Sequence, residues 1–217
     1  MQEFKKDRFT KWGINNRGSA FRGCTRLLSV KMTDSVLYIH TGAFYDCACL
    51  SEVSLSDNIN TISAYMFAYC RFIKNIKLPK SLQYIHHKAF LGCYNLRSIR
   101  LPNTLEIIEE KAFRGCVSLL RIYIPDKIKV IETAVFNSCH HLQEVRLPLH
   151  LNSIEKGAFF GCADLKKVEI PNTVTFLGED AFGLCFDLET VVLPLQLKTY
   201  IKCAFVDEID IKWQFLN

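Results

Sequence analysis

The chain has 217 residues, 49% of them apolar, and a formal net charge of +5 at pH 7. A chain of this length and composition can bury a substantial apolar core. It contains no run of 18 or more apolar residues, which excludes a helix that spans a membrane.

The first residues are rich in charge and lie outside the pattern that fills the rest of the chain. They lack the apolar stretch of a secretory signal peptide. If Met1 is the true start, we expect a cytoplasmic protein. If an export signal precedes this sequence, we expect a secreted or cell-surface protein. Apolar residues such as Phe9 and Trp12 predict that residues 1–17 form a degenerate N-terminal cap on a domain at 18–217.

A phenylalanine recurs every 23 residues through the rest of the chain. A fixed period of this length is the signature of a solenoid, in which each unit is too small to bury its own core and must stack on its neighbours. The sequence therefore predicts one domain of about nine stacked coils. The repeated residues are Phe21, Phe44, Phe67, Phe90, Phe113, Phe136, Phe159, Phe182 and Phe205.

Other apolar residues keep fixed distances from each phenylalanine, so the period reflects one coil geometry. Leucine or isoleucine lies six residues later, and valine or isoleucine lies nine residues later. Further apolar columns follow at 11, 15 and 18 residues. By this count Leu216 belongs to the column at 11 residues, and Gln214 takes a position in an apolar column of the ninth coil. We expect these columns to form one continuous core.

The segment before the proline of a coil alternates apolar and polar residues, as in Ser98-Ile99-Arg100-Leu101, which favours a short strand with one buried face. Proline cannot continue a ladder of backbone hydrogen bonds, so it ends this strand. The next part, such as 105–113, has apolar residues three and four apart, which predicts a short helical or 3₁₀ turn. The predicted fold class is therefore α/β, with short parallel strands on one face and short turns on the other.

Two columns directly after the phenylalanine hold glycine and cysteine. Glycine two residues on, as at Gly92 and Gly115, predicts a left-handed backbone that ends the turn, although other residues replace it in several coils. Cysteine three residues on recurs in eight coils, and identical residues in one column point the same way instead of toward one another. We interpret these cysteines as reduced, buried thiols that pack as small apolar side chains. Cys49 and Cys203 lie outside the column and are the more reactive thiols.

The unit LPxxLxxIxxxAFxGCxxLxxI, nearly intact at 101–122 and 147–168, resembles the 23-residue leucine-rich repeat of the BspA-like, or Treponema pallidum type, proteins. The resemblance covers roughly residues 18–217. It implies a leucine-rich-repeat solenoid that binds proteins. Members are often bacterial or protist surface proteins that attach to host or matrix proteins. The resemblance carries no catalytic residue and names no partner.

The solvent-facing columns of the predicted strands are rich in basic residues. This charge favours an acidic protein surface, a polyanion or an anionic headgroup, and Tyr123 adds an aromatic contact of a kind enriched in binding hot spots. We predict a strand face that binds a protein with an acidic surface. The alternative interpretation is a solvated face that discourages aggregation. The candidate residues are Lys74, Lys77, Arg97, Arg100, Arg121, Tyr123, Arg146, Lys166 and Lys167.

The sequence offers little for catalysis, cofactors or nucleic acid. The histidines occur as adjacent pairs, His86-His87 and His140-His141, unlike an HExxH pair on one helical face. GxSxG, P-loop, GxGxxG and EF-hand patterns are absent from the sequence. The cysteine column presents one sulfur per coil, whereas zinc requires four converging ligands. We therefore expect no enzyme activity, no cofactor and no metal, and the lack of a nucleic-acid motif argues against a nucleic-acid partner.

The C-terminal coil suggests a second function, self-association. The ends of a solenoid expose apolar core and usually require caps. Trp213, Phe215 and Leu216 follow the last phenylalanine without a polar finishing segment. The alternative hypothesis is therefore a structural spacer or self-assembly module that stacks through its ends.

Overall fold

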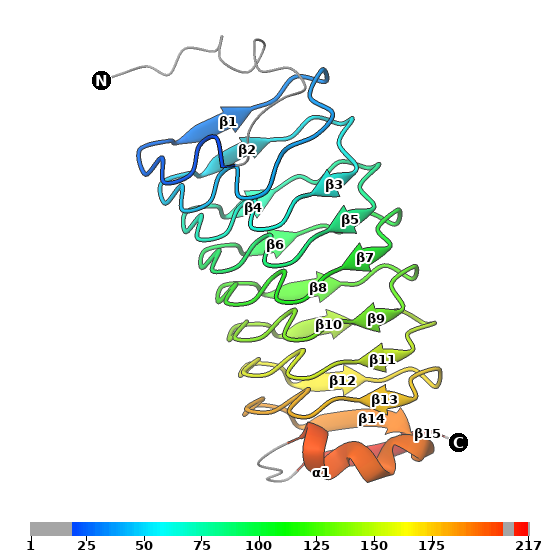
Figure 1. The fold of residues 1–217 in the computed structure, drawn as a ribbon. Helices are drawn as coiled ribbons and strands as arrows, with labels where there is room; N and C mark the ends of the chain where they lie inside the picture. Colours follow the sequence, from blue (N-terminus) through cyan, green and yellow to red (C-terminus); the bar gives the residue numbers. More distant parts are fainter. Residues whose placement is uncertain (1–18, 206–210, 217) are drawn as a thin grey trace.

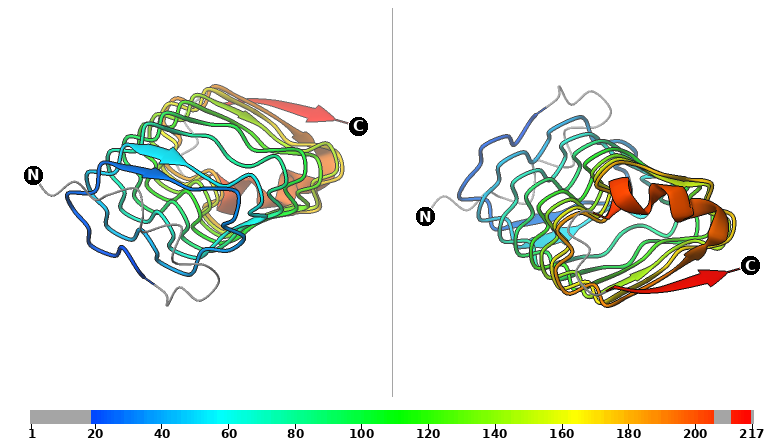
Figure 2. Two further views of the ribbon diagram at one scale, coloured as in Figure 1. Left: turned by 90° about the horizontal axis from the view of Figure 1, so that it is seen from above. Right: turned by 90° about the horizontal axis from the view of Figure 1, so that it is seen from below.

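The structure is a computed structural model that describes residues 19–205 and 211–216. Its coils stack along one axis, and each coil lies beside its sequence neighbours (Figure 1). Viewed from either end, successive coils superpose as flattened loops around a common interior (Figure 2). The predicted solenoid is therefore confirmed. The cap expected at 1–17 lies outside the described residues.

The first row of strands forms the face that the sequence predicted. Paired strands of neighbouring coils run in parallel, as Val145 lies opposite Ile122, which is 23 positions away. Ile122 is buried while Arg121 and Tyr123 on either side are exposed, so this row has one buried face. The row contains β1 (Ser29–Lys31), β2 (Glu52–Ser54), β4 (Asn75–Ile76), β6 (Ser98–Ile99), β8 (Arg121–Tyr123), β10 (Glu144–Arg146), β12 (Lys167–Glu169), β14 (Thr190–Pro194) and β15 (Lys212–Leu216). The pairs are β1 with β2, β4 with β6, β8 with β10, β12 with β14 and β14 with β15.

A second row of strands lies where the sequence predicted a helical or 3₁₀ turn. Its members have two residues each, and in the pair Ile107 and Ile108 the first is exposed and the second buried. They pair in parallel from coil to coil, as Ile85 does with Ile108. Their arrows point opposite to those of the first row in Figure 1. This row contains β3 (Thr61–Ile62), β5 (Tyr84–Ile85), β7 (Ile107–Ile108), β9 (Val130–Ile131), β11 (Ser153–Ile154) and β13 (Phe176–Leu177).

A run of tight turns completes each coil. In one such run the N–H groups of Ala89 and Leu91 donate to carbonyl oxygens three residues back, as in a 3₁₀ helix. The N–H groups of Lys88 and Phe90, which alternate with them, donate to carbonyl oxygens of the next coil. The turn backbone is therefore hydrogen-bonded both within and between coils.

Two residues in each of the first eight turns have a left-handed backbone. The predicted glycine column is confirmed, with φ of 66° at Gly92 and 72° at Gly115, and Tyr69 takes the same conformation with φ of 62°. A second column, two residues before the phenylalanine, also has positive φ and includes Lys88 and Lys111. The sequence did not indicate this second column because most of its residues are not glycine.

The core is a stack of phenylalanine rings flanked by aliphatic columns. Centroids of neighbouring rings lie 4.9–5.6 Å apart, and the ring planes differ by 3–19°. From Phe44 to Phe205 each of these rings is at most 2% exposed. The stack confirms that equivalent side chains lie above one another along a single apolar interior.

Six cysteines of the column are buried beside this stack, and those at its two ends, Cys24 and Cys185, are half-buried. All ten cysteines of the chain are free thiols. The Sγ of Cys93 lies 3.1 Å from the carbonyl oxygen of Phe67 in the preceding coil, and Cys116 repeats the contact with Phe90 at 3.3 Å. Burial raises the pKa of Cys139 to about 12, so the thiol keeps its proton. These thiols therefore donate hydrogen bonds between coils, beyond packing as small apolar groups.

Among the residues that the structure describes, helices occur only in the last coil. A 3₁₀ helix, η2 (Leu195–Tyr200), leads into α1 (Ile201–Ala204) on the side where the earlier coils have the second row of strands. Leu197 and Ala204 are buried and attach this segment to the end of the core. Among residues 19–205 and 211–216, no helix has the length and apolar character needed to cross a bilayer.

The predicted register of the last coil was wrong by one residue. Trp213, not Gln214, lies opposite Val191 in the inward column, and Leu216 lies opposite a proline. The cause is a shorter coil, since Trp213 follows Phe205 by eight positions where earlier coils have nine. The Trp213 ring packs edge-on against Phe205 with centroids 5.1 Å apart, so an aromatic residue closes the ring stack.

Candidate functional site

The nine residues predicted to bind a partner all lie exposed along the first row of strands. Arg121 and Tyr123 are on β8, Arg146 ends β10 and Lys167 begins β12. The other five directly precede or follow β4, β6 or β12. The outward direction of these side chains follows from the alternation within each strand, because their neighbours fill the core.

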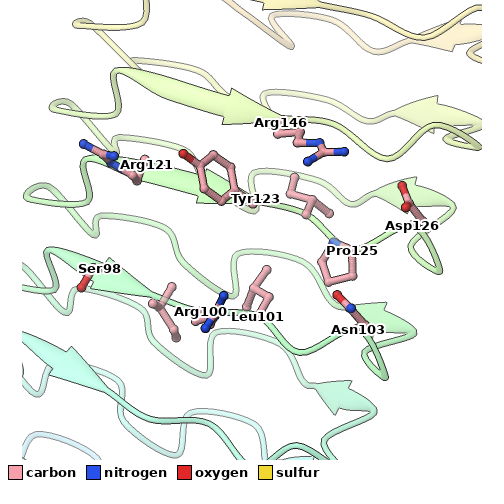
Figure 3. Close-up of a pocket in the computed structure, with 11 residues that line it drawn as sticks. Ser98, Arg100, Leu101, Asn103, Arg121, Tyr123, Pro125, Asp126 and Arg146 are labelled. Atoms are coloured by element: carbon pink, nitrogen blue, oxygen red, sulfur yellow. The ribbon is translucent and has the colours of Figure 1, made fainter.

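Four of these residues line a hollow of about 640 Å³ (Figure 3). Arg100 follows β6, Arg121 and Tyr123 come from β8, and Arg146 comes from β10. Three successive coils therefore contribute side chains to one depression. Lys74, Lys77 and Arg97, although on the same face, are not among the residues that line it.

The hollow coincides with an opening in the first row of strands. β6 pairs with β4 and β8 pairs with β10, but within the described part of the chain β6 and β8 do not pair. The last backbone bond between these coils on this side runs from the N–H of Leu120 to the carbonyl oxygen of Arg97, at 3.2 Å. The unpaired strands leave the space that the arginines surround.

Three arginines and one aspartate line the hollow, which gives its lining a net positive charge. Across residues 19–205 and 211–216, Arg100, Arg121 and Arg146 form no ion pair. Asp126 lines the same hollow, but its Oδ1 accepts the backbone N–H of Leu149 at 3.1 Å. Arginine presents several donors in a planar fork, which suits a carboxylate.

The side chain of Tyr123 is anchored at the rim of the hollow. Its hydroxyl donates to Glu144 Oε1 at 3.1 Å, while its side chain remains 49% exposed. Asn103 and Asp126 also line the hollow and were not predicted. Each directly follows the proline of its coil, at 102 and 125, and this shared position was the signal that could have identified them.

A second hollow, of about 570 Å³, continues the first toward the C-terminal end. It lies between β10 and β12, and Arg146 lines both hollows. Lys166 and Lys167 line the second hollow as predicted, but Lys167 Nζ lies 2.6 Å from Glu169 Oε1. The positive charge is therefore less compensated around the first hollow than around the second.

Three histidines, His86, His87 and His141, contact carboxylates on other parts of the surface. His86 Nδ1 lies 2.7 Å from Glu109 Oε1, and His141 Nδ1 lies 3.0 Å from Asp164 Oδ2. Within the part of the chain that the structure describes, no group of three His, Cys, Asp or Glu side chains could hold a metal ion.

Comparison with known proteins agrees with the repeat geometry. The family model for the BspA type leucine rich repeat region matches residues 14–119 and 83–212, with six copies of the repeat. The chain belongs to the BspA-type leucine-rich repeat family. The comparison with curated proteins found no match.

This BspA-type chain is similar to several solved structures. The crystal structure of the T. pallidum leucine-rich repeat protein is 30% identical, with a TM-score of 0.70, over 86% of this chain and 88% of that one. The pneumococcal vaccine antigen PcpA is 20% identical, with a TM-score of 0.50, over 77% of this chain and 51% of that one. The second likeness is one of fold alone.

Proposed function

We propose that this BspA-type chain is a noncatalytic scaffold that binds a protein partner through the first row of strands. The observation that carries the proposal is that Arg100, Arg121 and Arg146, from three successive coils, line one hollow together with Tyr123. The partner has an acidic surface, because unpaired guanidinium groups in a concave site attract carboxylates and can hold them in bidentate pairs. Attachment to a host or matrix protein is the role we propose on the family resemblance.

The composition of the hollow favours binding over a merely solvated face. Solvating surfaces are built mainly from lysine and glutamate, whereas binding surfaces are enriched in arginine and tyrosine. Lysines such as Lys74 and Lys77 lie outside this hollow, while arginines and Tyr123 line it. The hollow also offers the concave shape that a flat solvated sheet lacks.

Selection from a random peptide library displayed on phage tests this function directly. We expect the protein to enrich acidic peptides, and Arg100→Glu, Arg121→Glu and Arg146→Glu together to reverse that preference toward basic peptides. The matched reversal of Lys74, Lys77 and Arg97 to Glu changes as many charges on the same face outside the hollow. We expect it to leave the acidic preference intact. An identical selection by both triple variants would refute the hollow as the centre of binding.

Self-association is a second candidate function, supported by the last strand. β15 lies at the edge of its sheet, and Phe215 and Leu216 on it are 39% and 36% exposed. An open edge strand with exposed apolar residues can pair with a second copy. Light scattering over a concentration series measures this, and Phe215→Lys should reduce any association. A strict monomer at the highest concentration would exclude it.

A further inference from the structure

We propose a second binding site, on the turn side of the coils, for an acidic saccharide. The site is a hollow of about 420 Å³ lined by residues of the turns around Phe67, Phe90, Phe113 and Phe136. These turns follow the second row of strands and precede the first, so the site lies apart from the arginine hollow. The two proposed sites can therefore be tested independently.

Two glycines allow tyrosine rings to lie close to the backbone at this site. A Cβ atom on Gly92 would lie 2.8 Å from Tyr69 Cδ1 and 3.7 Å from Tyr94 Cζ. A Cβ atom on Gly115 would lie 4.0 Å from Tyr94 Cε1. Because the two glycines have no side chain, both tyrosine rings can lie close to the backbone. The side chain of Tyr94 remains 40% exposed. An exposed aromatic ring packs well against the apolar C–H face of a sugar ring.

Basic side chains surround these rings, and none of the residues that line the hollow is acidic. Lys88, Lys111, Arg114 and His140 line it from three successive coils. Lys88 Nζ donates to the Tyr65 hydroxyl at 2.9 Å and retains further donors.

Two neighbouring groups modify this charge. Lys111 Nζ lies 3.6 Å from Glu110 Oε1, but both side chains are accessible to solvent, so this pair is weak. The guanidinium of Arg71 lies 5.8 Å from the centroid of the Tyr94 ring and adds a positive charge beside the hollow. The site thus combines an aromatic surface with cations that attract carboxylate or sulfate groups.

The backbone around the hollow argues against a peptide ligand. Peptides in extended grooves are usually held by main-chain hydrogen bonds. Here the N–H groups of Lys88, Gly92 and Ser118 already donate to carbonyl oxygens of adjacent coils, at 3.1, 2.8 and 3.1 Å. The hollow therefore offers side-chain donors and aromatic faces, which are the groups that recognise a saccharide.

The extent of the charge argues against a polynucleotide. The column that contains Lys88 and Lys111 continues as Ala134 and Gly157 and then becomes Asp180. With coils about 4.8 Å apart, as for neighbouring strands, the basic track covers only a few coils. Single-stranded nucleic acid usually follows a longer positively charged groove. A short acidic oligosaccharide fits the dimensions better.

Isothermal titration calorimetry with defined oligosaccharides tests the site. The probes are a heparin-derived tetrasaccharide, which carries sulfate, and a tetragalacturonate, which carries only carboxylate. Cellotetraose is the neutral control, and an oligothymidylate of equal charge tests for general polyanion binding. We expect at least one acidic saccharide to bind and cellotetraose not to bind. The affinity should fall with added salt, since exposed charges are screened.

Matched variants locate the binding. We expect Lys111→Ala with Arg114→Ala to weaken binding about tenfold or more, equivalent to about 1.4 kcal/mol, and Tyr94→Ala to weaken it while Tyr94→Phe does not. Lys166→Ala with Lys167→Ala removes two cations from the strand face and should have no effect. Melting temperatures of all variants show whether the fold is retained.

Three results would overturn the proposal. The first is that neither acidic saccharide binds. The second is that Lys166→Ala with Lys167→Ala weakens saccharide binding as much as Lys111→Ala with Arg114→Ala does. The third is that Tyr94→Ala leaves the saccharide affinity unchanged and the oligothymidylate binds equally tightly. The Glu variant of Arg100, Arg121 and Arg146 should keep its saccharide affinity. Loss of peptide selection with retained saccharide binding therefore separates the two proposed sites.

Discussion

At the scale of single residues, the buried cysteines donate a second hydrogen bond to backbone carbonyl groups that already accept one from an N–H group. The carbonyl oxygen of Phe90 accepts the N–H of Cys93 at 3.1 Å from its own turn. It also lies 3.3 Å from the Sγ of Cys116 in the next coil. A carbonyl has two lone pairs, and a thiol is a weak donor that is small and apolar enough for the core. The column therefore links each turn to the next.

Alkylation of the native protein should distinguish the column from the exposed thiol. At about pH 8 a thiol with a pKa of about 12, such as Cys139, is ionised in about 1 molecule in 10,000, and only the thiolate reacts. We expect iodoacetamide to modify the exposed Cys203 rapidly and Cys139 only as the protein unfolds. Mass spectrometry of digested samples measures both rates. Native-state modification of Cys139 as fast as that of Cys203 would contradict this packing.

The left-handed glycines should differ in what an alanine costs. Gly115→Ala brings no contact closer than 3.7 Å, so we expect a loss of about 1–2 kcal/mol from the backbone conformation alone. Gly92→Ala should cost more, because its Cβ would lie 2.8 Å from the Tyr69 ring. Denaturant titration measures both variants. In a Tyr69→Ala background the additional cost at Gly92 should disappear, and its persistence would show that the ring is not the cause.

At the scale of elements, three glutamates follow successive strands of the second row. Glu109 follows β7, Glu132 follows β9 and Glu155 follows β11. Burial and then the charges of Glu155, Glu109 and Glu110 raise the pKa of Glu132. Burial also acts to raise the pKa of Glu109, but hydrogen bonds from His86 Nδ1 and the N–H of His87 outweigh it and lower that pKa.

These opposite pKa shifts predict that neutralising Glu132 and neutralising Glu109 have opposite effects on the stability of the folded protein. A raised folded-state pKa means that Glu132 favours folding when protonated, and this contribution is lost as pH rises through that pKa. A lowered folded-state pKa means that ionised Glu109 stabilises the folded protein at pH values above its unfolded-state pKa. This contribution is lost as pH falls through the folded-state pKa. At pH 7 we therefore expect Glu132→Gln to raise the denaturant midpoint and Glu109→Gln to lower it. Both differences should shrink near pH 3, and equal signs at pH 7 would contradict the assignment.

Much of the fold could be predicted because the apolar columns repeat at fixed positions through the first eight coils. The first row of strands was predictable from alternation, as at 98–101, and so was the outward direction of Arg100 and Arg121. The second row was not, because a two-residue strand such as β7 is too short to alternate, and its exposed residue, Ile107, is apolar. The hollow beside Tyr123 was also unpredictable, since it depends on which neighbouring strands fail to pair.

At the scale of the whole molecule, both rows of strands open between the same two coils. β6 and β8 of the first row are unpaired, and so are β7 and β9 of the second row, within the residues described. The core continues across this seam, since the rings of Phe90 and Phe113 stack with centroids 5.2 Å apart. The turns also remain bonded across it, as in Phe90 N–H to the Ala112 carbonyl oxygen at 2.8 Å. The strands are therefore unpaired at this seam on both faces, and the two coils are joined through the core, the turns and the bond from the Leu120 N–H to the Arg97 carbonyl oxygen.

Hydrogen exchange should detect this seam at one amide per coil. The N–H of Glu109 donates to the carbonyl oxygen of Ile85 at 2.9 Å, and that of Glu155 donates to Ile131 at 2.8 Å. The equivalent N–H of Glu132 has no acceptor among residues 19–205 and 211–216. Because exchange requires that a hydrogen bond be broken, we expect Glu132 to exchange about tenfold or more faster than the other two by NMR.

Glu109 and Glu155 serve as internal controls for this measurement, because they occupy the same position of the coil with the same side chain. Equal protection of all three amides would mean that the second row pairs across the seam in solution. In that case the arginine hollow, which depends on the unpaired β6 and β8 in the same interval, would have to be tested for closure as well. Fast exchange at Glu132 alone would instead place the weakest contact between coils beside the proposed protein-binding hollow. Low local stability at a binding surface permits adjustment to a partner.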